Sequence, residues 1–330
     1  MADHLDYWYF ELARKMKILP FLLLTIKEYR KEAKYSLQII KDEEISMLEN
    51  PLIDLEEKRI TKMLNCLNDA KFKLLMDSIN LKFISAEPFR ENMGMVNSMF
   101  IINAQTVNGI EVELMLRLTE QHPFFTNKKT ANEVAVINYL KQNTKIPVPI
   151  VLSHSNSKET SLIGCEYILM NKVKGKLLGD LIDEKFQDVN CLPEKLIDQM
   201  LEVFKQLRSV KFSQNKIGSF DLNMNIVALA QFGPFIEPCD NYLQFINKQL
   251  EWSIKEMNKI KIYKKLANEL EMFRKNLNQI VLDKKCLDNL NFNDEMSLTH
   301  GDLHAGNVFV DPDTYEITAI IDWEWAHFGW

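Results

Sequence analysis

Hydrophobic positions along this chain recur first with a helical period and then with the shorter period of strands. Up to about residue 81, apolar residues stand three to four positions apart among lysines and glutamates, most clearly in 29–48 and 54–81. That spacing is typical of amphipathic helices. We therefore expect a helical extension over residues 1–81, which either packs on the main domain or binds a protein partner through its helices.

From residue 82 to 171 short apolar segments replace the helical pattern. The candidate strands are 83–85, 99–103, 112–118, 151–154 and 166–171. Val107-Asn-Gly109 has the composition of a hairpin turn. Residues 130–142 have a helical period, and Ile146-Pro-Val-Pro149 ends that helix because proline disfavours helix in the residue before it. This part of the chain therefore predicts a small antiparallel sheet with one inserted helix.

After Gly175 the pattern is mainly helical, and its longest periodic stretches are 193–211 and 242–282. Two later segments, 308–310 and 317–321, read as strands joined through Asp311-Pro-Asp313. The predicted fold class is α+β with two lobes: an N-lobe over 82–171 and a mainly helical C-lobe over 172–330.

Composition restricts the function classes. The chain has 330 residues, 46% of them hydrophobic and 26% charged, which is ordinary for a soluble globular protein. Its net charge of -6 argues against a protein that coats nucleic acid. A polyphosphate ligand would have to be held by local hydrogen-bond donors and a metal ion, since no general basic field exists.

Three features of the sequence indicate the cellular location. The five cysteines are widely spaced without a C-x-x-C pair, which favours free thiols in a reducing compartment. The longest mostly apolar run, 18–26, contains Pro20 and is far too short to span a bilayer. Acidic residues close to the start argue against a targeting signal. We expect a cytoplasmic protein without a membrane span.

The end of the chain places Asp302, Asn307 and Asp322 in the segments Thr299-His-Gly-Asp-Leu-His-Ala-Gly-Asn307 and Ile320-Ile-Asp-Trp-Glu-Trp325. His300-Gly-Asp302-x-x-x-x-Asn307 has the register of the H-R-D-x-x-x-x-N loop, in which the aspartate accepts the proton of an acceptor hydroxyl. A strand hairpin over 308–321 would bring Asp322 alongside Asn307, and two hard oxygen ligands there suit Mg²⁺. These residues predict phosphoryl transfer, with His300, Asp302 and Asn307 in the catalytic loop and Asn307 and Asp322 as metal ligands.

Two other interpretations of these residues stay open. An aspartate and an asparagine near a glycine also occur as turn or helix caps. His300, Asp302 and His304 also resemble part of a metallophosphoesterase site, but such a site needs further ligands. The six histidines of the chain provide no second matching motif. We expect His304 to give structural support.

The same two segments resemble the aminoglycoside phosphotransferase family, which is choline kinase-like and has a protein kinase-like fold. Glu133-Val-Ala-Val-Ile-Asn-Tyr-Leu, Thr144-Lys-Ile-Pro-Val-Pro149 and Tyr167-Ile-Leu-Met-Asn-Lys-Val-Lys-Gly175 are similar to its fungal-type members. The resemblance covers about residues 82–330. It implies a two-lobed enzyme that uses ATP and Mg²⁺ to phosphorylate a hydroxyl of a small molecule.

The resemblance also implies individual roles. Asp302 matches the catalytic aspartate, while Asn307 and Asp322 match the magnesium ligands. Leu169 and Met170 belong to the segment 166–172, which resembles the hinge whose backbone binds adenine, although an ordinary buried strand would read the same way. Glu133 resembles the glutamate that pairs with a phosphate-binding lysine.

The chain departs from the family pattern at three places. Arg117 stands where that lysine is expected, and its guanidinium is able to bind phosphate and to pair with Glu133. The phosphate loop over 93–98 has a single glycine, Gly94, beside the potential donors Asn97 and Ser98, so a plain turn is an equal alternative. Family members continue beyond the Asp-Trp-Glu segment, and we therefore expect a C-lobe truncated at its end.

The leading hypothesis is thus an ATP- and Mg²⁺-dependent phosphotransferase acting on a small-molecule alcohol. The alternative from another class is a kinase-like protein that binds nucleotide or acts as a scaffold with weak or absent catalysis. The sequence does not identify the acceptor, because one fold serves many substrates.

Overall fold

The computed structural model describes residues 67–89, 97–119, 129–186, 192–212, 214–229, 236–259, 263–282 and 296–329. Contacts divide the chain after Cys66, and all described residues belong to the unit Leu67–Trp330. Most of the predicted extension over 1–81, with its proposed partner-binding helices, lies outside the described residues. The predicted boundary between lobes at residue 171 stays a prediction.

Helix α4 (Asp69–Asp77) belongs to the sheet unit, although the sequence assigned it to the extension. It begins after Asn68, whose side-chain oxygen accepts the Lys71 amide N–H at 3.1 Å. Phe72 on this helix stacks on Phe83 and packs against Phe100, with ring centroids 5.9 and 5.5 Å apart. The predicted helix therefore ends earlier than residue 81, and a turn leads into the first strand.

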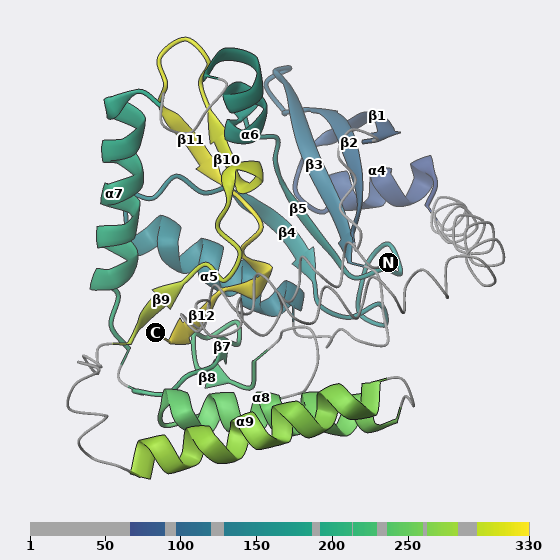
Figure 1. The fold of residues 1–330 in the computed structure, drawn as a ribbon. Coiled ribbons are helices and arrows are strands. Elements are labelled where there is room, and N and C mark those ends of the chain that lie inside the picture. Colours follow the sequence, from purple (N-terminus) through teal and green to yellow (C-terminus); the bar gives the residue numbers. More distant parts are fainter. Residues whose placement is uncertain are drawn as a thin grey trace, which may run out of the picture. The chain divides into compact units, whose positions relative to one another are not determined.

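Five strands form one antiparallel sheet in the order β1-β2-β3-β5-β4 (Figure 1). They are β1 (Lys82–Pro88), β2 (Asn97–Gln105), β3 (Glu111–Thr119), β4 (Val151–Ser155) and β5 (Tyr167–Asn171). Each contains one of the predicted segments, apart from the first residue of the last segment. Gly109 adopts φ +80° in the β2–β3 turn, a left-handed conformation that glycine adopts without steric cost. The predicted small antiparallel sheet is confirmed.

Helix α5 (Lys129–Asn143) is the inserted helix, between β3 and β4 in the chain. Its Val134 packs with Ile168 and Met170 of β5 in a small apolar cluster. Strand β5 lies between β3 and β4, and four of its five residues are buried. Central strands covered in this way read as continuous apolar runs in the sequence, without alternation.

The rest of the unit is mainly helical. Helix α6 (Leu178–Leu181) continues into a single π-helical turn, η1 (Ile182–Phe186), and α7 (Glu194–Ser209) follows. The long periodic stretch over 242–282 contains two helices, α8 (Tyr242–Asn258) and α9 (Lys264–Leu282). They lie side by side (Figure 1), joined by a hydrogen bond of 2.8 Å from Asn247 to Asn278.

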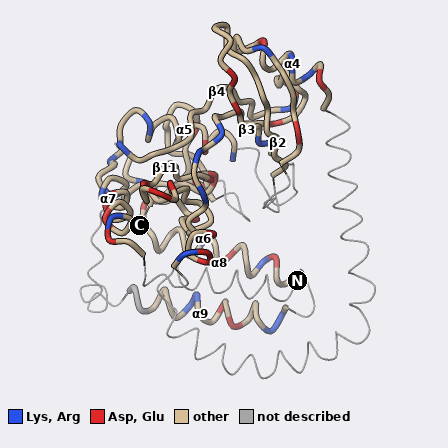
Figure 2. Tube along the Cα trace, turned by 90° about the horizontal axis from the view of Figure 1, so that it is seen from above, with Lys and Arg blue, Asp and Glu red and all other residues tan. Residues whose placement is uncertain are grey.

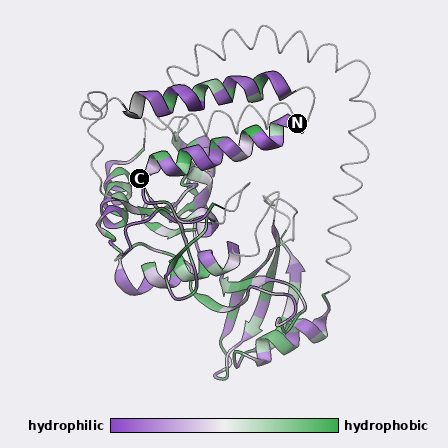
Figure 3. Ribbon diagram, turned by 90° about the horizontal axis from the view of Figure 1, so that it is seen from below, coloured by the Kyte–Doolittle hydropathy of each residue, from purple (hydrophilic) through white to green (hydrophobic). Residues whose placement is uncertain are grey.

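Side-chain character along α8 and α9 is mixed. Basic and acidic positions are interspersed on both helices (Figure 2). Hydrophobic positions alternate with hydrophilic ones along the same helices (Figure 3), as expected for amphipathic helices. No helix in the described part of the chain is long and apolar enough to cross a membrane.

Short strands connect the helices to the end of the chain. The predicted hairpin is present as β10 (Val308–Val310) and β11 (Ile317–Ile320), and β6 (Lys176–Leu177) pairs with β10. Strand β6 was not predicted, and neither were two further pairs: β7 (Ser219–Phe220) with β8 (Ile226–Val227), and β9 (Ser297–Thr299) with β12 (His327–Gly329). Strands of two or three residues are too short to show alternation.

Candidate active site

The β10–β11 hairpin positions the residues predicted to act in catalysis. The loop 300–307 leads into β10, and Asp322 follows β11 after one residue. Val308 pairs with Ile320, and the Ile321 amide donates to the Asn307 carbonyl at 3.0 Å. Asn307 and Asp322 therefore lie at the same end of the hairpin, as the spacing predicted.

Asp302 is held by backbone contacts while its carboxylate stays accessible. The Asn307 side-chain amide donates to the Asp302 carbonyl at 2.9 Å, which fixes the loop. The side chain of Asp302 remains 38% exposed, and His304 Nε2 lies 3.8 Å from its Oδ2. His304 Nδ1 accepts the Gly306 amide at 3.0 Å, consistent with the predicted structural support. A carboxylate in this setting can meet a hydroxyl that arrives from solvent.

His300 joins the loop to the Asp322 segment and does not face solvent. It is 2% exposed, its Nε2 lies 2.9 Å from the Ile321 carbonyl, and its Nδ1 accepts the Asp302 amide at 3.3 Å. Its ring packs on Trp323 at 4.3 Å between centroids. Since both ring nitrogens contact the backbone, His300 positions the loop, which corrects its assignment as a catalytic residue.

Gly301 lets the two segments approach closely. Its φ is +85°, and a Cβ at this position would lie 2.2 Å from the Trp325 carbonyl oxygen. Any other residue would strain the backbone and collide with Trp325. The positive φ and the close approach of Trp325 therefore explain why the residue between His300 and Asp302 is a glycine.

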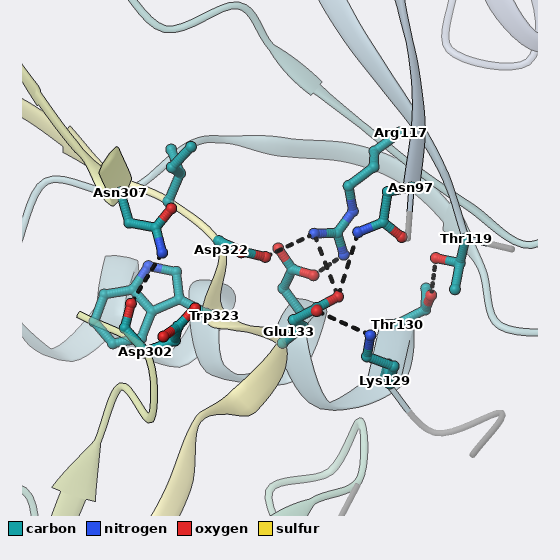
Figure 4. A network of polar contacts seen from close by, with 12 residues as sticks. Asn97, Arg117, Thr119, Lys129, Thr130, Glu133, Asp302, Asn307, Asp322 and Trp323 are labelled. Atoms are coloured by element: carbon teal, nitrogen blue, oxygen red, sulfur yellow. Dashed lines mark hydrogen bonds and ion pairs between the residues drawn. The ribbon is translucent and has the colours of Figure 1, made fainter. Parts of the chain in front are cut away.

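Arg117 of β3 lies at the centre of a buried group of charges (Figure 4). Its Nη2 bonds to Glu133 Oε2 of α5, so the predicted pairing of these two residues is present. Its Nη1 lies 3.3 Å from Asp322 Oδ1 and 3.9 Å from Glu324 Oε2. One guanidinium thus contacts three carboxylates.

Lys129 adds a second buried cation that the sequence did not single out. Its Nζ lies 2.8 Å from Glu324 Oε1 and 4.4 Å from the centroid of the Trp325 ring. Burial lowers the pKa of Lys129, while the neighbouring Glu324 acts in the opposite direction. We call Arg117, Lys129, Glu133, Asp322 and Glu324 the charge cluster. The only sequence signal for Lys129 is its position one turn before Glu133.

Asp322 has an unusual backbone and a perturbed carboxyl. Its φ of +64° and ψ of +53° are left-handed, which costs a non-glycine residue about 1 to 2 kcal/mol. Burial and the neighbouring Glu324 raise its pKa to about 7, while Arg117 acts in the opposite direction. The side chain as a whole is 30% exposed, more than that of any other member of the charge cluster.

The chemistry of the charge cluster fits a hard cation. Glu133, Asp322 and Glu324 each offer a carboxylate oxygen, and these atoms lie within 4.8 Å of one another. Carboxylate oxygens are the ligands that Mg²⁺ prefers. Asn307 uses its amide nitrogen on the Asp302 carbonyl, so its side-chain oxygen is the atom that can bind a metal ion, while Asp322 contacts Arg117 (Figure 4). His300 uses both ring nitrogens on the backbone and offers none to a metal ion, which argues against a metallophosphoesterase site built from His300, Asp302 and His304.

The predicted phosphate loop is only partly described. Gly94 lies outside the described residues, whereas Asn97 and Ser98 begin strand β2. Asn97 Nδ2 lies 3.4 Å from Glu324 Oε2, so this side chain faces the charge cluster. Ser98 is 7% exposed and opposite Leu118 in the sheet, which places it in a strand and not in an open loop.

The two residues predicted at the hinge lie within strand β5. Leu169 lies opposite Leu116 of β3 on one side and Ser153 of β4 on the other, and it is fully buried. Met170 is 8% exposed and packs in the apolar cluster against α5. Strands therefore flank both residues, and their role in binding adenine stays a prediction.

Sequence comparison gives the family. The phosphotransferase enzyme family matches residues 104–330, more than two thirds of the chain. This chain belongs to the phosphotransferase enzyme family. The resemblance found in the sequence is thereby confirmed, and so is the two-lobed α+β fold.

Individual relatives are more distant. Two subtelomeric hrmA-associated cluster proteins of Aspergillus fumigatus are 38% identical over 86 residues, which are 26% of this chain and 16% of each relative. The match thus spans about a sixth of the length of these curated relatives. A putative aminoglycoside phosphotransferase from Ralstonia eutropha is 17% identical with a TM-score of 0.48, covering 79% of this chain and 66% of its own. A macrolide 2'-phosphotransferase from Brachybacterium faecium is 16% identical with a TM-score of 0.46, covering 79% and 73%.

Proposed function

We propose that this member of the phosphotransferase enzyme family transfers the γ-phosphate of ATP to a hydroxyl of a small molecule. The observation that carries the proposal is the position of Asp302. Its partly exposed carboxylate lies at the same open end of the β10–β11 hairpin as Asp322, which belongs to the charge cluster. An accessible base beside a buried charged site is what transfer to an external acceptor requires.

In the proposed reaction Asp302 orients the acceptor hydroxyl and accepts its proton. The hydroxyl oxygen forms a bond to the γ-phosphorus, the bond to the β-phosphate oxygen breaks, and ADP leaves. Asn307 and Asp322 are proposed to hold Mg²⁺, with Glu133 and Glu324 close enough to assist. When bound, Mg²⁺ would neutralise the charge on the phosphate oxygens.

Arg117 is proposed to bind the donor phosphates in place of lysine. Its forked guanidinium matches phosphate geometry. Its Nε is buried without a hydrogen-bond partner in the described part of the chain, as is the Asn97 side-chain oxygen. We propose residues 172–174, directly after β5, as the backbone that contacts adenine.

Isothermal titration with ATP, with and without Mg²⁺, tests the proposal. We expect binding that depends on Mg²⁺ and is weakened by Asp322→Ala. Asp313→Ala is the matched control, because Asp313 is an exposed aspartate in the turn of the same hairpin. If ATP binds in neither condition, the proposed function is wrong.

A second candidate function follows from the carboxylates that contact Arg117. Because three carboxylates already surround it, the site would serve a nucleotide-binding or scaffolding protein with weak catalysis. Transfer of labelled phosphate to a panel of alcohols separates the two. Binding of ATP without transfer to any acceptor would favour the second candidate.

A further inference from the structure

Three residues on one face of α5 contact the segment that follows β11. Lys129, Asn132 and Glu133 stand three and four positions apart, which places them on the same side of the helix. Lys129 reaches Glu324, and Glu133 reaches the segment through Arg117. Lys129 and Glu133 point toward the same centre in Figure 4. The helix and the segment 322–326 are therefore joined by polar contacts.

Asn132 is the member of this set that binds the backbone itself. It is fully buried, and its Nδ2 donates to the Glu324 carbonyl at 3.1 Å and to the Ala326 carbonyl at 2.9 Å. Its Oδ1 accepts the Phe220 amide at 2.8 Å. Both donor hydrogens and the acceptor are used, so the side chain has one orientation.

These contacts complete the support of Asp322. On its N-terminal side, the Ile321 amide donates to Asn307 and the Ile321 carbonyl contacts His300. On its C-terminal side, Asn132 holds the carbonyls of Glu324 and Ala326. A left-handed non-glycine residue persists only where its surroundings impose that conformation.

We propose that Asn132 is a positioning residue for the Asp322 carboxylate, and that Lys129 assists it by holding the Glu324 side chain. The inference rests on the proposed function in so far as Asp322 binds the metal ion. In this arrangement α5 and the segment 322–326 form one rigid unit before any nucleotide binds. Groups that orient metal ligands typically change metal affinity about 10- to 100-fold when they are replaced.

The test compares Asn132→Asp with Thr130→Val. Aspartate has nearly the same volume as asparagine, and its first carboxylate oxygen can still accept the Phe220 amide. Its second oxygen replaces the amide nitrogen and faces the carbonyl oxygens of Glu324 and Ala326. Thr130 is equally buried on the same helix and bonds to Thr119 at 2.9 Å, so its replacement disturbs α5 without touching the segment. Both variants are checked for folding by thermal unfolding.

Two readouts are needed. Hydrogen exchange of the amides of Ile321 and Ala326 should be about 10-fold faster in Asn132→Asp than in Thr130→Val, because only the first variant frees the segment. Binding of Mn²⁺ in the presence of ATP, followed by water-proton relaxation, should weaken about 10-fold or more in Asn132→Asp alone. A role limited to packing would change neither quantity relative to Thr130→Val.

The outcomes separate the inference from the proposed function. Equal exchange in the two variants overturns the inference, whatever the metal result. If the unmodified protein binds no Mn²⁺ with ATP, the proposed function fails, while the exchange result still decides whether Asn132 holds the segment. Should Asn132→Asp not fold, Lys129→Met takes its place, with the same direction expected and a smaller loss of Mn²⁺ affinity.

Discussion

Four side chains of the charge cluster and two of the catalytic loop lie in opposite environments. The side chains of Arg117, Lys129, Glu133 and Glu324 are 6, 1, 2 and 5% exposed, whereas those of Asp302 and His304 are 38 and 47% exposed. Groups that must be held in one geometry are buried and bonded to each other. The group that must meet an acceptor is held by its backbone and left open.

This difference separates the residues that stabilise the fold from the residue that is proposed to act in the reaction. In the cluster two cations face three carboxylates, and each of these buried ionised groups depends on its partners. In the loop the Asp302 carboxylate has no such role, since the loop is fixed through the Asp302 backbone. Replacing a cluster residue should therefore lower the stability of the folded protein, whereas replacing Asp302 should lower the rate of phosphate transfer.

The largest effect is expected for Asp302→Asn. Asparagine has nearly the same shape but accepts no proton, so turnover should fall roughly 100-fold or more. ATP affinity and the unfolding temperature should change little, because the carboxylate supports neither. Phosphate transfer and titration calorimetry measure the two quantities, and unchanged turnover would remove Asp302 from the mechanism.

Arg117→Met should cause the greatest loss of stability. It leaves three carboxylates facing one cation, and breaking a buried pair in this way costs about 3 to 5 kcal/mol. Glu133→Gln removes one of the excess negative charges, so its cost should be smaller, about 1 to 3 kcal/mol. Urea unfolding at pH 7 measures both.

Arg274→Met is the matched control for Arg117→Met. Arg274 also contacts two carboxylates, Glu251 and Glu271, but on the surface of α9. Such exposed pairs contribute about 0 to 1 kcal/mol. Equal losses at the two arginines would contradict the contrast between buried and exposed charge.

Gly301→Ala tests the contact between the two regions. The added Cβ would meet the Trp325 carbonyl, so we expect a loss of more than about 2 kcal/mol from strain and overpacking. Gly109→Ala is the control: its φ is also positive, but nothing lies within 4 Å of the new Cβ. There only the conformational cost of about 1 to 2 kcal/mol remains. Equal losses would show that the close approach to Trp325 is unimportant.

The smallest effect is expected at Glu166, which is buried beside the charge cluster. Burial raises its pKa above the ordinary value of 4.5, while Thr130 and Arg117 act in the opposite direction. The folded state then binds more protons than the unfolded state, so the contribution of this group is present below pH 4.5 and is lost as pH rises through the raised pKa.

Glu166→Gln should therefore gain stability relative to the unmodified protein as pH rises above 4.5, and show no such trend below it. Urea unfolding at several pH values measures the difference. The exposed Glu111→Gln should show no comparable trend. A constant difference between Glu166→Gln and the unmodified protein would mean that burial does not control this carboxyl.

Several features followed from residue order alone. The five strands of the sheet, the inserted helix and the last hairpin came from local periodicity and turn residues, which act within a few positions. The spacing of Asp302, Asn307 and Asp322 predicted their common end of the hairpin because strand pairing fixes it. Arg117 and Glu133 were predicted as a pair and do form one.

Other features depended on contacts between distant segments. Asn132 and Lys129 are nearly 200 positions from Glu324, and nothing in their helix marks them as ligands of that segment. Leu169 and Met170 were predicted from a segment that also reads as a buried strand, and only the structure showed that β3 and β4 flank them on both sides. His300 could be assigned to catalysis until its two backbone contacts were known.

The sequence by itself determined the family, the order of the secondary-structure elements and the identity of the proposed base. These depend on side-chain chemistry and on spacing along the chain, both of which are local. The tertiary structure alone decided which charges are buried together, how Asp322 is held and which residues stay open. Burial and pairing arise from packing between remote segments, and no local pattern encodes them.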